Sequence, residues 1–180
     1  MTELNTDTIV ALATPQGVGA IGVIRLSGSK SIDILSKVFS KDLRNANSHT
    51  AHFGQIKDKD RIVDEVLVTL FLDGKSYTGE EVVEVSCHGS QYILQDVIRL
   101  FVENGALPAK PGEFTLRAFL NGKLDLSQAE AVADIIESNS EAAHKEGLQQ
   151  MRGGISEQIK KFRADLIHFA SMVELELDFS

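Results

Sequence analysis

Four charged residues are the strongest candidates for chemistry in this 180-residue sequence. Arg25 lies at the end of an apolar run, and Glu84 lies inside another one. Arg117 and Lys123 lie in a glycine-containing segment at residues 111–127. A pocket that offers one carboxylate and a few cations suits a flat heterocycle with N–H donors that also carries anionic groups.

A folate has that chemical form, with a pterin edge rich in N–H donors and an anionic tail. The same four side chains could instead form an intramolecular set of salt bridges. Residue types alone leave both interpretations open.

Metal and thiol chemistry find little support in the sequence. The histidines are scattered, and Cys87 is the only cysteine, so no zinc-binding spacing exists. Cys87 and His88 are neighbours, but neighbouring strand residues point to opposite faces of a sheet, so adjacency does not make them a nucleophile and base pair. We therefore predict neither a metal site nor a catalytic residue in this chain.

Two glycine motifs resemble nucleotide-binding signatures and fail on context. Gly17, Gly19 and Gly22 match the dinucleotide fingerprint, but a strand pattern follows them where that motif requires a helix. Residues 74–76 read Gly-Lys-Ser, yet Thr69 stands where a phosphate-binding loop needs its first glycine. The glycines at 17–22 are better explained by a close approach of the backbone to another strand or to a flat ligand.

Composition and charge narrow the class of protein. The 18 lysines and arginines against 26 acids give a formal charge of −8, which argues against a free-standing nucleic-acid binder with a broad basic face. A single cysteine excludes an intramolecular disulfide and is typical of a reducing compartment. Residues 1–7 are polar and acidic, and no apolar run reaches the length of a membrane span, so we expect a cytoplasmic protein without a membrane segment.

The hydrophobic pattern predicts an α+β fold with a mixed sheet. Strands are expected at residues 9–13, 20–26, 50–56 and 63–71, with a further strand after the turn at 77–81, and helices at 31–39 and 90–103. Glu84 falls in the middle of a strand beside apolar neighbours, where an unpaired carboxylate is costly to bury. We therefore expect Glu84 to have a partner.

The second part of the chain reads as helical. Pro111 suits a helix start, Gly122 suits a helix end, and Ser127 with Glu130 forms a potential capping box for the next helix. After a short helix that ends near residues 138–140, one long helix is expected, with Gly153-Gly154 as a soft point inside it or at its start. Its apolar residues recur every three or four positions and are Ile155, Ile159, Phe162, Leu166, Phe169, Val173 and Leu177. This apolar row has no complete partner in the sequence, and we expect the chain to be the front part of a longer protein.

Several long strings in order give the chain a specific resemblance to the MnmE (TrmE) family, the GTPases of tRNA uridine-5-carboxymethylaminomethyl modification. The resemblance runs from about residue 5 to the end. It is carried by Asp7–Pro15 with Gly19–Gly28, by Tyr77–Glu80 with His88-Gly89, and by Pro111–Phe114 with Ala118–Leu126 and Gln128–Ala131. The chain departs from the family pattern at Cys87, where glycine is often found, and at Ser90, where a second glycine is common.

The resemblance implies two domains and a cofactor site. It implies a folate-binding and dimerisation domain at residues 1–121 and the first part of an α-helical domain at residues 122–180, with the GTPase domain absent from this chain. The family's folate contacts match Arg25, Glu84 and Lys123 here. The implied cofactor is a one-carbon tetrahydrofolate, in its 5-formyl or 5,10-methylene form.

For the full-length protein, the resemblance implies a homodimeric enzyme that hydrolyses GTP with K+ and Mg2+. With an MnmG-type flavoprotein, such an enzyme installs a (carboxymethyl)aminomethyl group on the wobble uridine of tRNA. Two alternatives remain open at this point. The segment could be a dimerisation module with a vestigial folate pocket, or a stand-alone domain similar to folate-dependent aminomethyltransferases.

Overall fold

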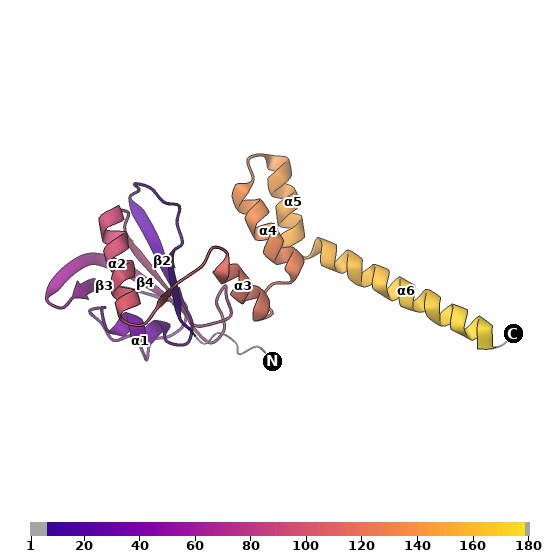
Figure 1. Ribbon diagram of the computed structural model, residues 1–180, viewed down its shortest axis with the longest axis horizontal. Helices are drawn as coiled ribbons and strands as arrows, with labels where there is room; N and C mark the ends of the chain where they lie inside the picture. Colours follow the sequence, from indigo (N-terminus) through magenta and orange to yellow (C-terminus); the bar gives the residue numbers. More distant parts are fainter. Residues whose placement is uncertain (1–6, 179–180) are drawn as a thin grey trace. The chain divides into compact units, whose positions relative to one another are not determined.

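The computed structural model describes residues 7–178, except for the side chains of residue 155 and residues 175–178. Residues 1–6 and 179–180, which entered the expectations about the chain ends, lie outside the described residues, as do the side chains of Ile155 and Leu177. The chain divides into two compact units, Met1–Lys123 and Leu124–Ser180. Figure 1 shows the elements of both units.

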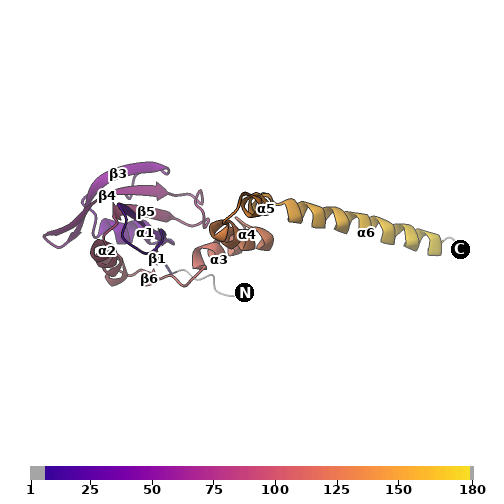
Figure 2. The same cartoon turned by 90° about the horizontal axis from the view of Figure 1, so that it is seen from above.

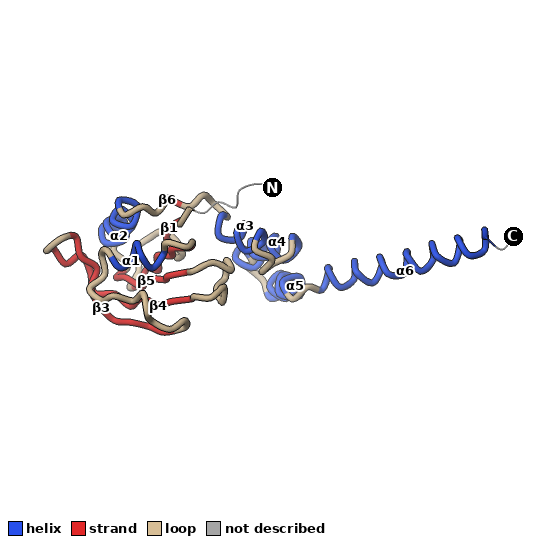
Figure 3. The backbone as a smooth tube through the Cα atoms, turned by 90° about the horizontal axis from the view of Figure 1, so that it is seen from below, coloured by secondary structure: helices blue, strands red, loops and turns tan. Residues whose placement is uncertain are grey.

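The first unit is built on a mixed sheet, as the sequence predicts, and its sixth strand, β6, adds to the five strands expected. Its strands lie in the order β3-β4-β5-β2-β1-β6, and Figure 3 shows them in red. All neighbours are antiparallel except β1 and β6, which are parallel. The strands are β1 Ile9–Leu12, β2 Ile21–Ser27, β3 Thr50–Asp58, β4 Arg61–Phe71, β5 Val82–His88 and β6 Leu107–Pro108.

Three helices accompany this sheet: α1 Ser31–Ser36, α2 Gln91–Glu103 and α3 Glu113–Leu120. Helices α1 and α2 lie on one face and close the hydrophobic core (Figure 2). The core joins alternate strand residues to apolar helix residues, among them Ile24, Leu26, Val83, Val85, Leu35, Val97 and Phe101. The odd-numbered residues of β2 and the even-numbered residues of β5 therefore face the other side, and that side carries the candidate site.

The glycines before and in β2 confirm the strand context and correct one detail. Strand β2 follows Gly17 and Gly19 where a dinucleotide-binding motif would need a helix, so the rejection of that motif is confirmed. A Cβ atom added at Gly22 would lie 2.7 Å from the Leu94 side chain. The close approach at Gly22 is therefore to helix α2, not to another strand as the sequence suggested.

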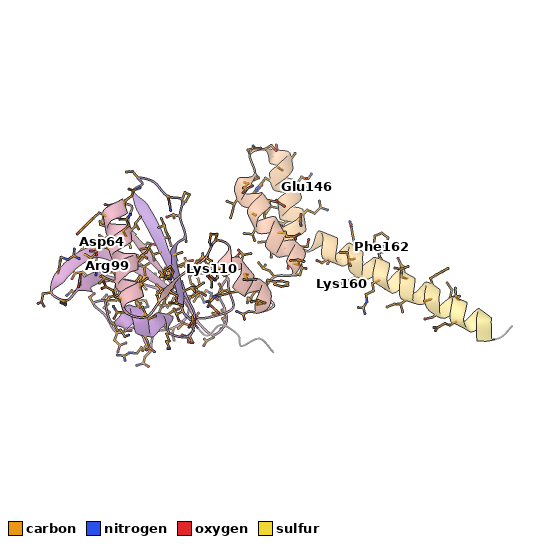
Figure 4. All side chains as sticks on the ribbon, in the orientation of Figure 1. Asp64, Arg99, Lys110, Glu146, Lys160 and Phe162 are labelled. Carbon is orange, nitrogen blue, oxygen red and sulfur yellow. The ribbon has the colours of Figure 1, made fainter. Side chains whose placement is uncertain are left out.

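The second unit contains α4 Leu126–Glu137, α5 Glu141–Met151 and α6 Gly154–Asp178. The expected long helix is α6, and Gly153-Gly154 lies at its start and not inside it, because Gly153 adopts φ +83 and separates α5 from α6. The described apolar residues of α6, for example Phe162 in Figure 4, remain exposed. None of the described helices combines the length and apolar content that a membrane crossing requires.

Two predictions of helix ends are also corrected. The capping box of α4 is formed by Asp125 and Gln128 and not by Ser127 and Glu130. Asp125 has an extended backbone and is the N-cap residue, whereas Ser127 already lies inside the helix. Helix α3 begins at Glu113 behind Gly112, whose φ is +74, so Pro111 lies outside the helix. Gly122, with φ +69, is left-handed just after α3 as expected.

Candidate functional site

Arg25 and Glu84 meet across the open face of the sheet. The register of β2 and β5 places them directly opposite each other. Arg25 Nη2 lies 2.8 Å and Arg25 Nε 2.9 Å from the same oxygen, Glu84 Oε1. The expected partner of Glu84 is therefore Arg25, and the prediction that this acid is paired is confirmed.

This ion pair is reachable from solvent and leaves one acceptor open. About a quarter of each side chain is exposed, 23% for Arg25 and 26% for Glu84. Glu84 Oε2 accepts no hydrogen bond from the described residues. A carboxylate oxygen in this position can accept N–H groups of a ligand while Arg25 holds the other oxygen in place.

Two aromatic rings flank the guanidinium of Arg25. Its Cζ lies 5.5 Å from the ring centroid of Tyr77 and 5.4 Å from that of Phe114, within the range of cation–π contacts. Tyr77 comes from the loop before β5 and Phe114 from α3. These rings add flat apolar surface beside the polar pair, and the sequence analysis did not identify either of them.

Lys123 lies against the loop that carries Tyr77. Its Nζ donates a hydrogen bond of 3.1 Å to the carbonyl oxygen of Gly74. A Cβ atom at Gly79, which has φ +78, would lie 3.0 Å from Lys123 Cγ. No hydrogen bond or ion pair joins Lys123 to Arg25 or Glu84 within the described residues, but the 74–79 loop that Lys123 contacts also carries Tyr77, which lies beside Arg25.

Arg117 is not a free cation but the centre of a buried clasp. Only 6% of its side chain is exposed. Its Nη1 donates to the carbonyl oxygen of Asp7 at 2.7 Å and to Glu80 Oε1 at 3.2 Å, and its Nη2 donates to Glu113 Oε1 at 3.3 Å. Of the four charged candidates, Arg117 therefore has a structural role.

Hydroxyl and amide groups extend this clasp around Glu80 and Thr78. Ser27 Oγ donates to Glu80 Oε2 at 2.6 Å and lies 2.7 Å from Thr78 Oγ1. Asn121 Nδ2 donates to the Thr78 carbonyl oxygen at 2.7 Å. The clasp fixes the loop between β4 and β5 against β2 and α3, and so fixes the positions of Tyr77 and Phe114 beside Arg25.

Cys87 occupies a different environment. Its side chain is buried on the core face, and burial together with the nearby Asp64 carboxylate raises the pKa of the thiol to about 12. A thiol in this state is a poor nucleophile at neutral pH. This agrees with the prediction that Cys87 is not catalytic.

The comparisons with known proteins match both units. The sequence profile described as GTP-binding protein TrmE N-terminus matches residues 8–123, and the profile described as MnmE helical domain matches residues 126–180. A protein of Cytophaga hutchinsonii named tRNA modification GTPase MnmE is 63% identical over 177 residues, which cover 98% of this chain and 38% of that protein.

Two further proteins with the same name give similar values. The protein of Flavobacterium psychrophilum is 57% identical over 178 residues, covering 97% of this chain and 38% of its own length. The protein of Bacteroides thetaiotaomicron is 53% identical over 182 residues, covering 98% and 39%. The chain therefore spans less than two fifths of the length of these relatives.

Proposed function

This chain belongs to the MnmE (TrmE) family of GTP-binding proteins, and from that premise we propose that its first unit binds a one-carbon tetrahydrofolate at the Arg25–Glu84 pair. The 5-formyl and 5,10-methylene forms are the candidate ligands. Glu84 Oε2 accepts N–H groups of the pterin edge, and Arg25 and Lys123 orient its carbonyl or anionic parts. The pairing of Arg25 with Glu84 across β2 and β5 is the observation that carries this proposal.

The surroundings of the pair favour a flat ligand. Tyr77 and Phe114 present aromatic surface next to the guanidinium. The 74–79 loop contacts Lys123 on one side and carries Tyr77 on the other, so a ligand beside Arg25 lies close to the element that holds Lys123.

For the whole protein we propose the tRNA-modifying activity for which its relatives are named. In that proposal the protein is a cytoplasmic homodimer that works with an MnmG-type flavoprotein and installs a (carboxymethyl)aminomethyl group on the wobble uridine of tRNA. GTP, K+ and Mg2+ then bind to a GTPase domain outside this sequence, because these residues contain no phosphate-binding loop.

Helix α6 supports a continuation of the helical domain beyond this sequence. Large apolar side chains are exposed along it, with 60% exposure for Ile159 and 68% for Phe162. A helix with such a surface is stabilised when another element covers it. Further helices of the same domain are the proposed cover.

A second candidate function is assembly without folate binding. Apolar side chains on the open sheet face favour it, since Ile21, Phe53 and Leu67 are 66%, 58% and 43% exposed. A dimerisation module would cover them with a second copy and would not bind folate. A stand-alone aminomethyltransferase would instead form product without any GTPase domain.

Calorimetric titration with 5-formyltetrahydrofolate tests the proposal directly. Replacing Glu84 by alanine removes a charged acceptor, so we expect affinity to fall by at least about tenfold while the fold is kept. Asp60→Ala, at an exposed turn in the same unit, is the matched control and should bind like the unaltered chain. Equal binding by Glu84→Ala would refute the assignment, and dimers that bind no folate would favour the assembly function.

A further inference from the structure

Helix α1 and the end of helix α2 border a cleft on the face of the sheet that the helices cover. Lys37, just after α1, donates a hydrogen bond of 3.1 Å from Nζ to the carbonyl oxygen of Asn104, just after α2 (Figure 1). The cleft beside this contact has a volume of about 470 Å³, which is within the range of small-molecule sites. It is separate from the Arg25–Glu84 site, which lies on the open face.

Basic side chains line this cleft. Lys30 and Lys37 are both exposed, and Lys30 Nζ makes no hydrogen bond or ion pair with any described residue. Lys37 uses one of its three N–H groups on the Asn104 carbonyl oxygen, so two remain for a ligand. Arg44 also lines the cleft, but its Nε and Nη2 donate to Asp42. The two lysines are therefore the cations open to a ligand, and an ammonium group is a common phosphate binder.

The cleft also carries a carboxylate and an unused hydroxyl. Asp33 lines it, is exposed, and forms no ion pair or side-chain hydrogen bond with another described residue. Ser36 also lines it, and its buried Oγ has no hydrogen-bond partner in the described part of the chain. A buried hydroxyl without a partner is uncommon, because it loses its bonds to water and gains none. A change of the Ser36 rotamer toward a ligand in the cleft supplies the missing bond.

This set of groups matches one unit of an RNA backbone. The lysines and the serine hydroxyl can donate to phosphate oxygens, and the Asp33 carboxylate can accept a hydrogen bond from a ribose 2′-hydroxyl. DNA lacks this hydroxyl, so Asp33 favours RNA over DNA. The formal charge of −8 argues against a broad basic face, but a local cleft can still hold one phosphate.

We propose that this cleft binds one backbone phosphate of tRNA together with the neighbouring ribose. Lys30, Lys37 and Ser36 donate to the phosphate, and Asp33 accepts the hydrogen bond of the 2′-hydroxyl. The proposal rests on the proposed function, in which tRNA is the substrate. It adds a tRNA contact on the face of the sheet opposite the folate site. Such a contact positions the tRNA and carries no sequence information.

Fluorescence anisotropy with a labelled tRNA transcript that has uridine at the wobble position tests this contact. Lys30→Ala should weaken tRNA binding about threefold to tenfold and reduce the slope of log affinity against log salt by about one, the effect of one lost phosphate contact. Lys110→Ala removes the same charge from an exposed position outside the cleft and is the matched control (Figure 4). It should leave tRNA affinity and the salt slope nearly unchanged.

Ser36→Ala separates a binding role from a structural one. The lost hydroxyl makes no hydrogen bond to the described residues, so the urea unfolding midpoint should not fall, whereas tRNA affinity should fall about threefold. A lower midpoint with unchanged tRNA affinity would overturn the assignment of Ser36 to the site.

Asp33→Ala tests the preference for RNA. An RNA hairpin with the anticodon-stem sequence and a DNA hairpin of the same sequence are the two probes. The change removes a repulsion for both phosphates but a 2′-hydroxyl acceptor for RNA alone, so the ratio of RNA to DNA affinity should fall. A ratio equal to that of the unaltered chain would overturn the role of Asp33.

The outcomes separate this proposal from the proposed function. Weaker tRNA binding in Lys30→Ala with unchanged 5-formyltetrahydrofolate binding supports the cleft. Equal tRNA affinity and salt slope in Lys30→Ala and Lys110→Ala overturn the cleft proposal and leave the folate site and the tRNA-modifying activity standing. Displacement of tRNA by an equimolar amount of guanosine monophosphate assigns the cleft to a free nucleotide and also overturns it. If the unaltered chain binds folate but no tRNA, the cleft proposal fails and the folate proposal stands.

Discussion

Arg25 directs both of its short contacts to one oxygen of Glu84, Oε1, from the directly opposite position on the neighbouring strand. The two charges neutralise each other, but the second carboxylate oxygen of Glu84 stays available to a ligand, because Oε2 accepts no hydrogen bond from the described residues. The same guanidinium lies beside Tyr77 and Phe114. Arg25 therefore orients the acid through its fork of N–H groups and orients the rings through its flat surface.

Replacing Arg25 by lysine keeps the charge and removes this geometry. A lysine ammonium cannot form the forked contact or stack on the rings, so we expect folate affinity to fall about tenfold. The free energy of unfolding should change by no more than about 1 kcal/mol, because the pair is partly exposed. Calorimetry and urea denaturation measure the two effects.

Arg44→Lys provides the control for this change, since Arg44 forms an exposed pair with Asp42 away from the site. It should alter neither folate affinity nor the unfolding midpoint. Folate affinity of Arg25→Lys equal to that of the unaltered chain would show that charge alone is sufficient.

The Arg117–Glu80 clasp should matter for stability first. Arg117→Met leaves Glu80 and Glu113 without their cation in a largely buried place, at a cost of about 3 kcal/mol or more. Urea denaturation followed by circular dichroism should show the loss. Glu80→Gln keeps the shape and most hydrogen bonds and should cost less, and Arg152→Met, at an exposed position of the second unit, should cost almost nothing. A midpoint unchanged in Arg117→Met would contradict the role of the clasp.

The sequence predicts the sheet and helices of the first unit because apolar alternation and helical spacing are local signals. It also predicts that Glu84 needs a partner, since a mid-strand acid is costly to bury. The identity of that partner depends on strand register, which no local pattern specifies. The sequence also does not show that Arg117 is buried and Arg25 partly exposed. The burial of Arg117 arises from its contacts with Asp7 and Glu80, which are distant in the chain.

The sequence analysis also missed the pair of Asp64 and His88, in which Asp64 Oδ1 lies 2.6 Å from His88 Nδ1. Asp64 lies on the same face of β4 as the core residues Val66 and Val68, and an acid in such a row is a sequence signal for a buried, paired carboxylate. Its partner His88 is 24 positions away in the sequence, so no local pattern connects the two residues. The sequence indicates a weak point of the helix at Gly153-Gly154. It does not specify that Gly153 adopts a left-handed φ and so separates α5 from α6.

Acid should weaken the first unit through a charge network on α2. Arg99 and Arg61 donate to Asp96 at 2.6 Å each, and Asp58 joins the network. Burial alone would raise the pKa of Asp96, but the hydrogen bonds from Arg99 and Arg61 outweigh it and lower that pKa. Hydrogen bonds from Arg99 and Arg61 lower the pKa of Asp58 as well.

Because the folded pKa of Asp96 lies below its unfolded value of about 3.9, the network stabilises the fold above that pH and is lost as pH falls through the folded pKa. Urea denaturation from pH 7 down to about pH 3 should therefore show Asp96→Asn as destabilised at neutral pH. The gap to the unaltered chain should narrow in acid. A gap that stays constant with pH would assign the loss to packing instead of charge.

Gly89 should tolerate no side chain, because the backbone of another loop occupies the space. A Cβ atom there would lie 2.3 Å from the carbonyl oxygen of Gly19. Gly89 N–H also donates to the Ala20 carbonyl oxygen at 3.1 Å, so neither chain can move away without losing this contact. Gly89→Ala should therefore cost about 1–3 kcal/mol, as forced overpacking does, in urea denaturation.

Gly19→Ala is the matched change on the other side of the same contact. Its added Cβ would meet only the Ile21 carbonyl oxygen at 3.6 Å, an ordinary contact, so stability should be nearly unchanged. Equal stability of the two alanine variants would show that the Gly19 loop adapts and that Gly89 does not fix the end of β5.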